Sequence, residues 1–447
     1  MERAPGRPAP SRLFYDWKWR NAWHLLPAAA IVLGAFLLAR DLAGDGANTP
    51  PLAMVDSQYE ERLAANIEFF EGRVQETNDS LSYNRLVSLY LERLRLTGGA
   101  GDVRRAELAA ERAIEVAPNA YASVLSMARV RLAQHDFAGV LELTTRAEAL
   151  RPGEPDTLAL AGDAKMALGR YDEAGADYRR YLELSPGFSA FTRMAIFEET
   201  YGNIAVAAQF WDAAIGATRE ELPLDSAWAR AQLANLLATN GDLDRAEREF
   251  ETALQVFPGY SLAEAGLARV AAMRGDYDTS LALYAMATAK LPSPEFIAPY
   301  AETALAAGDM ATYERQSALL RAIGQLYEAN GIRNDLTLIL FELDHGDAAA
   351  GLPAAEAAYR ERPSLAAADT YAWALYRNGG FDDAGRYADE ALRLGTKEPL
   401  YLFHAGMVAA ANGDNDTARL HLEAALEIDR EFHPLFAKEA RTRLYPN

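Results

Sequence analysis

The chain has 447 residues, more than one hydrophobic core usually accommodates, so it forms either several domains or one elongated array of repeats. It has no cysteine, which excludes disulfides, thiolate nucleophiles and cysteine-ligated zinc. The formal charge is −20; residues 1–40 hold six Lys/Arg against two Asp/Glu, so the remainder holds 38 against 62 and carries −24. An acidic body is repelled by phosphate backbones, so we expect no nucleic-acid partner, although solubility alone also explains the charge.

The first predicted element is a membrane-spanning helix. Residues 23–39 carry no formal charge, and their length is at the short end of what a hydrocarbon layer of about 30 Å requires. Basic residues precede this stretch and Asp41 and Asp45 follow it, so the positive-inside rule keeps the N-terminus in the cytoplasm. The sequence therefore predicts a cytoplasmic basic leader over 1–22, a transmembrane signal anchor over 23–42 and a flexible linker over 43–55.

Two alternatives to an anchor follow from the same stretch. A short apolar segment also suits a cleaved secretory signal, which would release a soluble exported protein. A buried soluble helix is disfavoured, because residues 44–51 are typical of a flexible linker. With either an anchor or a cleaved signal, residues 45–447 lie outside the cytoplasm, which in a bacterium is the periplasm.

After an amphipathic helix expected over residues 56–78, one short pattern returns about every 34 residues. It consists of a glycine, any residue, an aromatic or aliphatic residue, two further residues and a small residue. The ten copies begin at Gly101, His135, Gly169, Gly202, Gly241, Gly275, Gly308, Gly346, Gly379 and Gly413. The glycine ends one helix in a left-handed turn, and the Asp that often follows can cap the next helix, so each copy predicts a helical hairpin.

Some copies depart from the pattern. His135 replaces the glycine of the second copy, and the eighth has Ala348 where an aromatic is expected. Pro299 and Pro353 fall inside predicted helices of the seventh and eighth copies. We expect those helices to start late, with the proline in the first turn.

Two copies fill most of a known signature. The signature positions hold Gly162, Gly169, Tyr171, Ala174, Tyr178 and Pro186 in one copy, and Gly241, Ala246, Phe250, Ala253 and Pro258 in another. In these residues the chain resembles the tetratricopeptide repeat (TPR) family, over residues 81–430. The resemblance implies an all-α, right-handed α-solenoid of about ten helix-turn-helix repeats, here preceded by one transmembrane helix. Helices over 56–78 and 431–447 are expected to cap its two ends.

The resemblance also implies that partners bind on the concave face, which is lined by the first helix of each repeat. Counting back from the turn glycines gives the candidate protein-binding residues Asp369, Thr370, Trp373, Tyr376, Arg377, His404, Trp228, Asn235 and Arg269. Aromatic side chains beside charges are typical anchors for a bound peptide. The alternative is that Trp373 and Tyr376 seal the array against its C-terminal cap.

No residue pattern indicates catalysis, a cofactor or a metal site. Outside the repeats there is too little chain for a separate catalytic domain. We therefore expect a non-enzymatic, membrane-tethered scaffold, adaptor or assembly factor that binds proteins or peptides and no small-molecule substrate. The alternative is a non-catalytic accessory subunit of a membrane enzyme or transporter complex.

Overall fold

The computed structural model describes residues 57–98, 100–219, 222–329 and 335–445. The predicted leader, transmembrane helix and linker all lie outside these residues. Among the described residues, no helix combines the length and apolar character that crossing a membrane requires.

Within the described residues the chain forms helices α2 to α23 and no strand. The first is α2 (Ser57–Thr77), where an N-terminal helix was expected, and the last is α23 (Phe436–Leu444). Ten hairpins, called units one to ten, lie between them. They are α3 (Ser80–Thr97) with α4 (Ala100–Val116), α5 (Tyr121–Ala133) with α6 (Phe137–Leu150), α7 (Pro155–Ala167) with α8 (Tyr171–Leu184), α9 (Phe188–Thr200) with α10 (Ile204–Gly216), α11 (Pro223–Thr239) with α12 (Leu243–Val256), α13 (Ser261–Met273) with α14 (Tyr277–Lys290), α15 (Pro294–Ala307) with α16 (Met310–Ala329), α17 (Leu336–His345) with α18 (Ala348–Glu361), α19 (Leu365–Arg377) with α20 (Phe381–Leu392), and α21 (Pro399–Ala411) with α22 (Asn415–Ile428).

Left-handed turns set the register of these hairpins. In units three to seven, nine and ten the turn glycine has a φ between 70° and 82°. His135 takes the same conformation, with φ 61°, although a side chain is disfavoured there. In unit one the left-handed residue is Gly98, with φ 66°, and the predicted Gly101 lies inside α4 instead. Gly346 of unit eight has φ −128° at the C-terminus of α17, and the side chain of Asp347 caps α18.

The prediction of late helix starts at the two prolines is wrong. Helix α15 begins at Pro294 and α18 at Ala348, so Pro299 and Pro353 lie in their second turns. A proline there removes one helical hydrogen bond. Burial of Phe296 and Ile297 in the first turn of α15 offsets that loss.

The C-terminal helix is also shorter than the predicted 431–447. It begins only at Phe436, because Pro434 disfavours a helical conformation at His433. The Nδ1 atom of His433 then accepts the backbone N–H groups of Leu435 and Phe436, at 3.2 and 3.4 Å. The imidazole thus caps the helix start.

Small residues bring the two helices of a hairpin together. A Cβ atom added to Gly162 would lie 2.4 Å from the ring of Tyr178, and one added to Gly266 would lie 2.1 Å from Phe250. Tyr178 and Phe250 are fully buried at these crossings. The signature glycines and aromatics therefore face each other directly.

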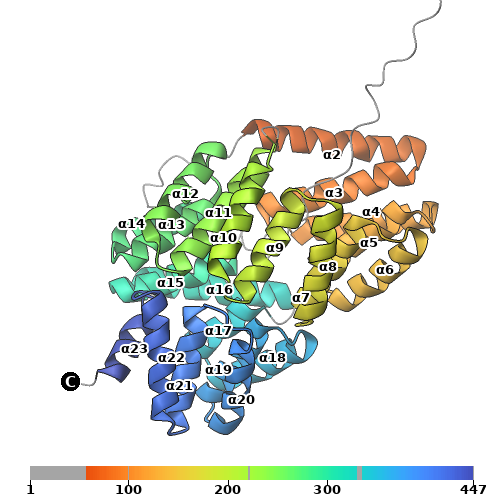
Figure 1. Ribbon diagram of the computed structural model, residues 1–447. Helices are drawn as coiled ribbons and strands as arrows, with labels where there is room; N and C mark the ends of the chain where they lie inside the picture. Colours follow the sequence, from red (N-terminus) through yellow and green to blue (C-terminus); the bar gives the residue numbers. More distant parts are fainter. Residues whose placement is uncertain (1–56, 99, 220–221, 330–334, 446–447) are drawn as a thin grey trace, which may run out of the picture.

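The coil of units closes on itself, which the repeat pattern did not predict. The turn glycines of units three, four and five lie against the chain at the ends of units eight, nine and ten. In Figure 1 the helices of units three to five, α7 to α12, lie above α17 to α22. An added Cβ would approach the carbonyl oxygen of Pro363 from Gly169, of Gly395 from Gly202 and of Ile428 from Gly241, at 2.1, 2.1 and 2.8 Å. The backbone N–H of Leu365 also donates to the Tyr171 hydroxyl at 2.8 Å.

These contacts give a testable difference between two equivalent glycines. We expect Gly202→Ala to destabilise the protein by at least about 1–2 kcal/mol more than Gly275→Ala. Both substitutions strain a left-handed residue, but a Cβ at Gly275 meets nothing within 4 Å. Thermal or urea unfolding of both variants measures the difference, and equal losses would contradict direct packing between successive turns of the coil.

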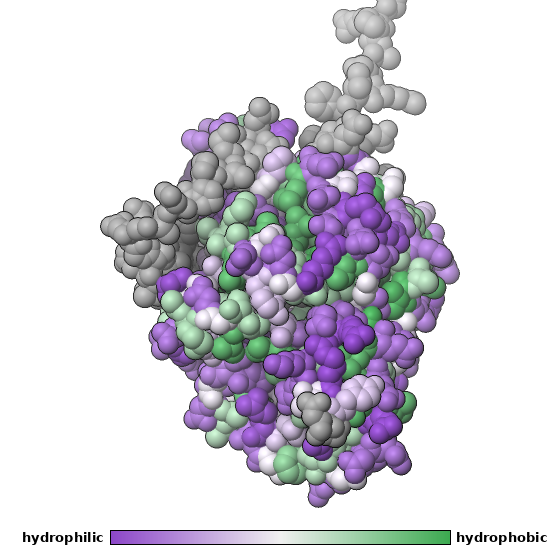
Figure 2. Space-filling view, turned by 90° about the vertical axis from the view of Figure 1, so that its left-hand side faces the viewer, coloured by the Kyte–Doolittle hydropathy of each residue, from purple (hydrophilic) through white to green (hydrophobic). Residues whose placement is uncertain are grey.

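On the face that Figure 2 shows, polar residues predominate and apolar residues form separate, smaller areas. This face therefore lacks the broad apolar surface that many stable protein contacts use.

Candidate functional site

The candidate site is the inner face of the coil, formed by the first helix of each unit. On this face we compare one position in successive units. It is the residue six places before the turn glycine, here called the inner-face position. It is Asn235 in unit five, Arg269 in unit six, Glu302 in unit seven and Trp373 in unit nine.

The structure divides the nine sequence-predicted residues into two groups. Asp369, Thr370, Trp373, His404 and Trp228 are 1–4% exposed. Tyr376, Asn235 and Arg269 are half-buried and Arg377 is exposed, so all four keep contact with solvent. Only the second group can touch a partner without rearrangement, and the binding role of all nine stays a prediction.

Trp373 lies at the centre of an aromatic cluster. Its ring stacks on His404 at 4.1 Å and on Tyr376 at 4.7 Å, and it meets Phe436 of the C-terminal helix edge-on at 6.2 Å. Its indole N–H donates to Asp344 at 2.8 Å. This geometry is what the cap-sealing alternative requires of Trp373.

A buried pair joins units nine and ten. The Nδ1 atom of His404 lies 3.0 Å from both carboxylate oxygens of Asp369. The Nε2 atom of His404 is buried and has no hydrogen-bond partner among the described residues. Phe403, next to it, is fully buried among the aromatic rings.

Trp228 belongs to a different part of the core. Its ring packs against Trp211 at 5.4 Å and Phe188 at 6.2 Å, across units four and five. It therefore joins neighbouring units and presents little surface to a ligand.

Asn235 and Arg269 leave a polar surface in the middle of the coil. Glu398, at the start of unit ten, and Asp429, which follows that unit, lie close enough to Arg269 for its charge to act on both carboxyl groups. Burial raises the pKa of both carboxyl groups, and Arg269 acts in the opposite direction. One oxygen of Asp429 is buried and has no hydrogen-bond partner among the described residues. The surface thus combines a cation with two carboxyl groups, one of which is incompletely paired.

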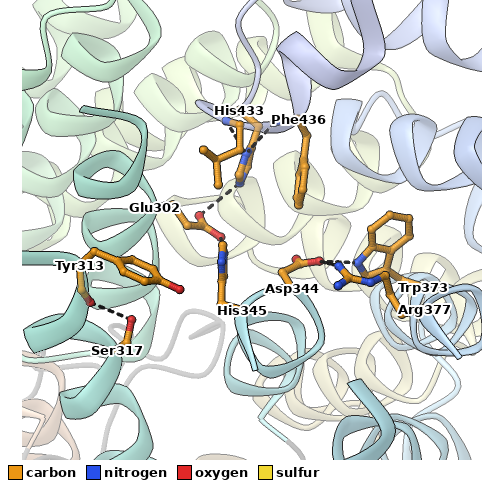
Figure 3. Close-up of polar contacts among 10 residues, drawn as sticks. Glu302, Tyr313, Ser317, Asp344, His345, Trp373, Arg377, His433 and Phe436 are labelled. Carbon is orange, nitrogen blue, oxygen red and sulfur yellow. Dashed lines mark hydrogen bonds and ion pairs between the residues drawn. The ribbon is translucent and has the colours of Figure 1, made fainter. Parts of the chain in front are cut away.

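Glu302 is the inner-face residue that the sequence analysis missed (Figure 3). One of its carboxylate oxygens lies 3.2 Å from Nε2 of His345, and the other lies 3.2 Å from Nε2 of His433. Burial by itself would raise its pKa, but the two imidazoles lower it to about 2. The same count from Gly308 that found Arg269 from Gly275 would have found Glu302. Nothing in the sequence, however, places His433 beside it.

A second charged contact lies next to it. Arg377 donates to Asp344 at 2.8 Å, the same carboxylate that accepts the indole N–H of Trp373. Arg377 thus keeps its side chain along the rim of the aromatic cluster.

Glu199 supplies a pH-dependent prediction. Burial, and then the charge of Glu398, raise its pKa from 4.5 to about 7. A raised carboxyl pKa means that the folded state favours the protonated form, so this stability is fully present below pH 4.5 and is lost as pH rises through about 7. Because the side chain is only partly buried, we expect Glu199→Gln to stabilise the protein by about 1–2 kcal/mol at pH 8 and by little at pH 4.5.

Melting temperatures at both pH values test this expectation. The control is Glu183→Gln, since the side chain of Glu183 is 64% exposed. A stabilisation that is the same at both pH values would exclude titration of Glu199 as its cause.

The described residues include no group of three or more His, Asp or Glu side chains arranged to hold a metal ion. The contacts above join segments of the chain to one another.

Comparison with known proteins agrees with the hairpin geometry. Two family models, each described as tetratricopeptide repeat, match the chain: one at residues 231–293 and 370–431, the other at residues 155–188. These stretches are tetratricopeptide repeats. They cover unit three, unit six, unit ten and most of units five and nine, where the turn glycines are left-handed.

Solved structures with TPR-like coils are similar over much of the chain. Yeast Tom70 is 13% identical, with 92% of this chain and 95% of that one covered and a TM-score of 0.38. The APC/C hetero-tetramer Cut9–Hcn1 is 14% identical, with 87% and 94% covered and a TM-score of 0.34. MamA is 17% identical, with 38% and 91% covered and a TM-score of 0.30. Because these TM-scores are low, the similarities carry no argument about site geometry.

No curated protein matches the chain.

Proposed function

We propose that this protein is a non-enzymatic scaffold or assembly factor that binds other proteins through the inner face of its TPR coil. The observation that carries the proposal is the pair of half-buried inner-face residues Asn235 and Arg269, together with the effect of the Arg269 charge on the carboxyl groups of Glu398 and Asp429. Polar groups held at fixed places on stacked helices are suited to reading the backbone and charges of a bound segment. Tetratricopeptide repeats on both sides of this surface support a partner that is a protein.

The proposal includes a membrane tether. The uncharged residues 23–39 would anchor the protein with its N-terminus in the cytoplasm and the coil on the opposite side, in the periplasm of a bacterium. The protein is then expected to stay with membranes through an alkaline wash. A soluble mature form beginning near residue 45 would contradict the anchor and leave the binding function standing.

The binding function is tested by purifying the full-length protein from detergent-solubilised membranes and identifying what stays bound. Arg269→Gln removes the inner-face cation and should weaken retention of a true partner by about 1.4–2.8 kcal/mol, or roughly tenfold to a hundredfold. The control is Arg180→Gln, because the Arg180 side chain is 58% exposed on α8, the second helix of its unit. A partner that both variants retain equally does not use the inner face.

A further inference from the structure

The segment between the last hairpin and the last helix crosses the inner face of the coil. Residues 429–436, called the C-terminal strap, follow α22 and run into the first residue of α23. A cap needs to cover only the exposed side of the last unit, and the buried Ala437 and Ala440 of α23 do that. The strap extends beyond the last unit, as far as unit seven.

Three aromatic or polar side chains of the strap make the long-range contacts. His433 lies 3.2 Å from Glu302 on α15, which belongs to unit seven. Phe436 stacks on Phe403 of unit ten at 5.0 Å, and it meets Trp373 of unit nine at 6.2 Å. Phe432 packs on Phe403 from another side, at 5.9 Å. The strap therefore touches the first helices of units seven, nine and ten.

The hydrogen-bond direction at His433 is fixed by its surroundings. Since Nδ1 accepts two backbone N–H groups, the proton of the imidazole lies on Nε2. Nε2 therefore donates to Glu302, whose other oxygen is engaged by His345. Figure 3 shows Glu302 between the two imidazoles, with the ring of Phe436 beside His433.

The strap contacts inner-face positions that a protein partner would also contact. Glu302 and Trp373 hold inner-face positions, as do Asn235 and Arg269. His433 and Phe436 of the strap contact the first two residues, and the charge of Arg269 acts on Asp429 at the start of the strap. All four inner-face positions lie on one continuous series, the first helices of units five to nine. An arriving segment that followed the inner face beyond unit six would meet the strap.

We propose that the C-terminal strap occupies, within the chain, the place of a protein partner on the inner face of units seven to ten. That partner is an extended segment with two aromatic side chains flanking a hydrogen-bond donor, as Phe432, His433 and Phe436 are arranged. Its aromatic rings pack against Phe403 and Trp373, and its donor binds Glu302. This inference rests on the proposed protein-binding function and identifies the class of segment that is bound.

The experiment uses full-length protein in detergent and a fluorescein-labelled synthetic peptide of residues 429–445. The release variant is His433→Ala with Phe436→Ala, which removes the donor and the main aromatic ring of the strap. By fluorescence anisotropy, it should bind the peptide at least about tenfold more tightly than the unchanged protein, whose site is filled. Adding Glu302→Gln to the release variant should weaken peptide binding again by about tenfold.

The control is His421→Ala, since His421 lies on α22 outside the strap, and it should behave like the unchanged protein. If the double variant loses its helical circular dichroism, His433→Ala alone takes its place, because it keeps the Phe436 ring that packs on Phe403 and Trp373. A folded release variant that binds the peptide no better than the unchanged protein would overturn the proposal.

Two further outcomes are decisive. A stable dimer of the release variant that excludes the peptide would assign this face to a second copy of the chain and overturn the proposal. Absence of peptide binding, together with a partner lost only on Arg269→Gln, would reject the strap inference and leave the proposed function intact.

Discussion

Replacing Asp163 with alanine is expected to lower the free energy of unfolding by about 3–5 kcal/mol. Asp163 and Arg193 are buried between units three and four, with side chains 0% and 2% exposed. Arg193 donates to the two carboxylate oxygens from Nε at 2.8 Å and Nη2 at 2.6 Å, and Tyr178 donates to the same carboxylate at 2.9 Å. Without the carboxylate, a guanidinium remains buried in an apolar setting with much of its charge uncompensated.

Urea unfolding followed by circular dichroism measures this loss of unfolding free energy. Two matched variants show how much of it comes from the unpaired charge. Arg180→Ala breaks an exposed pair with Glu183 and should cost less than about 0.5 kcal/mol. Replacing both buried partners, as Asp163→Leu with Arg193→Met, should cost less than Asp163→Ala, because no unpaired charge is left. If Asp163→Ala costs no more than Arg180→Ala, the buried pair does not hold these units together.

The hairpins were predictable because their determinants are local. A left-handed residue ends one helix, an aspartate often caps the next, and small residues permit the crossing. Gly169, Gly241 and Gly275 are all left-handed in the structure, and Asp242 and Asp276 cap the helices that follow the last two. Unit one was placed three residues late because Gly98 and Gly101 both precede a helical pattern, and only the backbone conformation distinguishes them.

The closure of the coil was not predictable because its determinants are distant. Gly202 and Gly275 have the same role in their own hairpins, yet only Gly202 lies against another turn of the coil. Its partner, Gly395, comes from a connection almost two hundred residues later. Small changes of angle between successive units add up to this contact, and no single residue encodes them.

The candidate site shows the same division. Counting from a turn glycine gives the positions of Arg269 and Asn235, which are half-buried in the structure, because that count depends only on the helical repeat. It could not show that Trp373 and His404 are covered, because the covering residue Phe436 comes from the far end of the chain. Whether an aromatic side chain on the inner face is buried therefore depends on which distant segments of the chain pack against it.

Replacing Trp373 with alanine should cost about 3–5 kcal/mol, because a buried aromatic side chain would leave a cavity between His404, Tyr376 and Phe436. Asp344 would also lose the indole donor. Tyr376→Ala is the matched variant: its ring stacks on Trp373 but is half-exposed, so it should cost only about 1 kcal/mol. Thermal unfolding and protease cleavage around residues 429–436 measure both effects. A Trp373→Ala protein that keeps its melting temperature yet loses a bound partner would instead make Trp373 a direct anchor, and would require the strap to move aside when the partner binds.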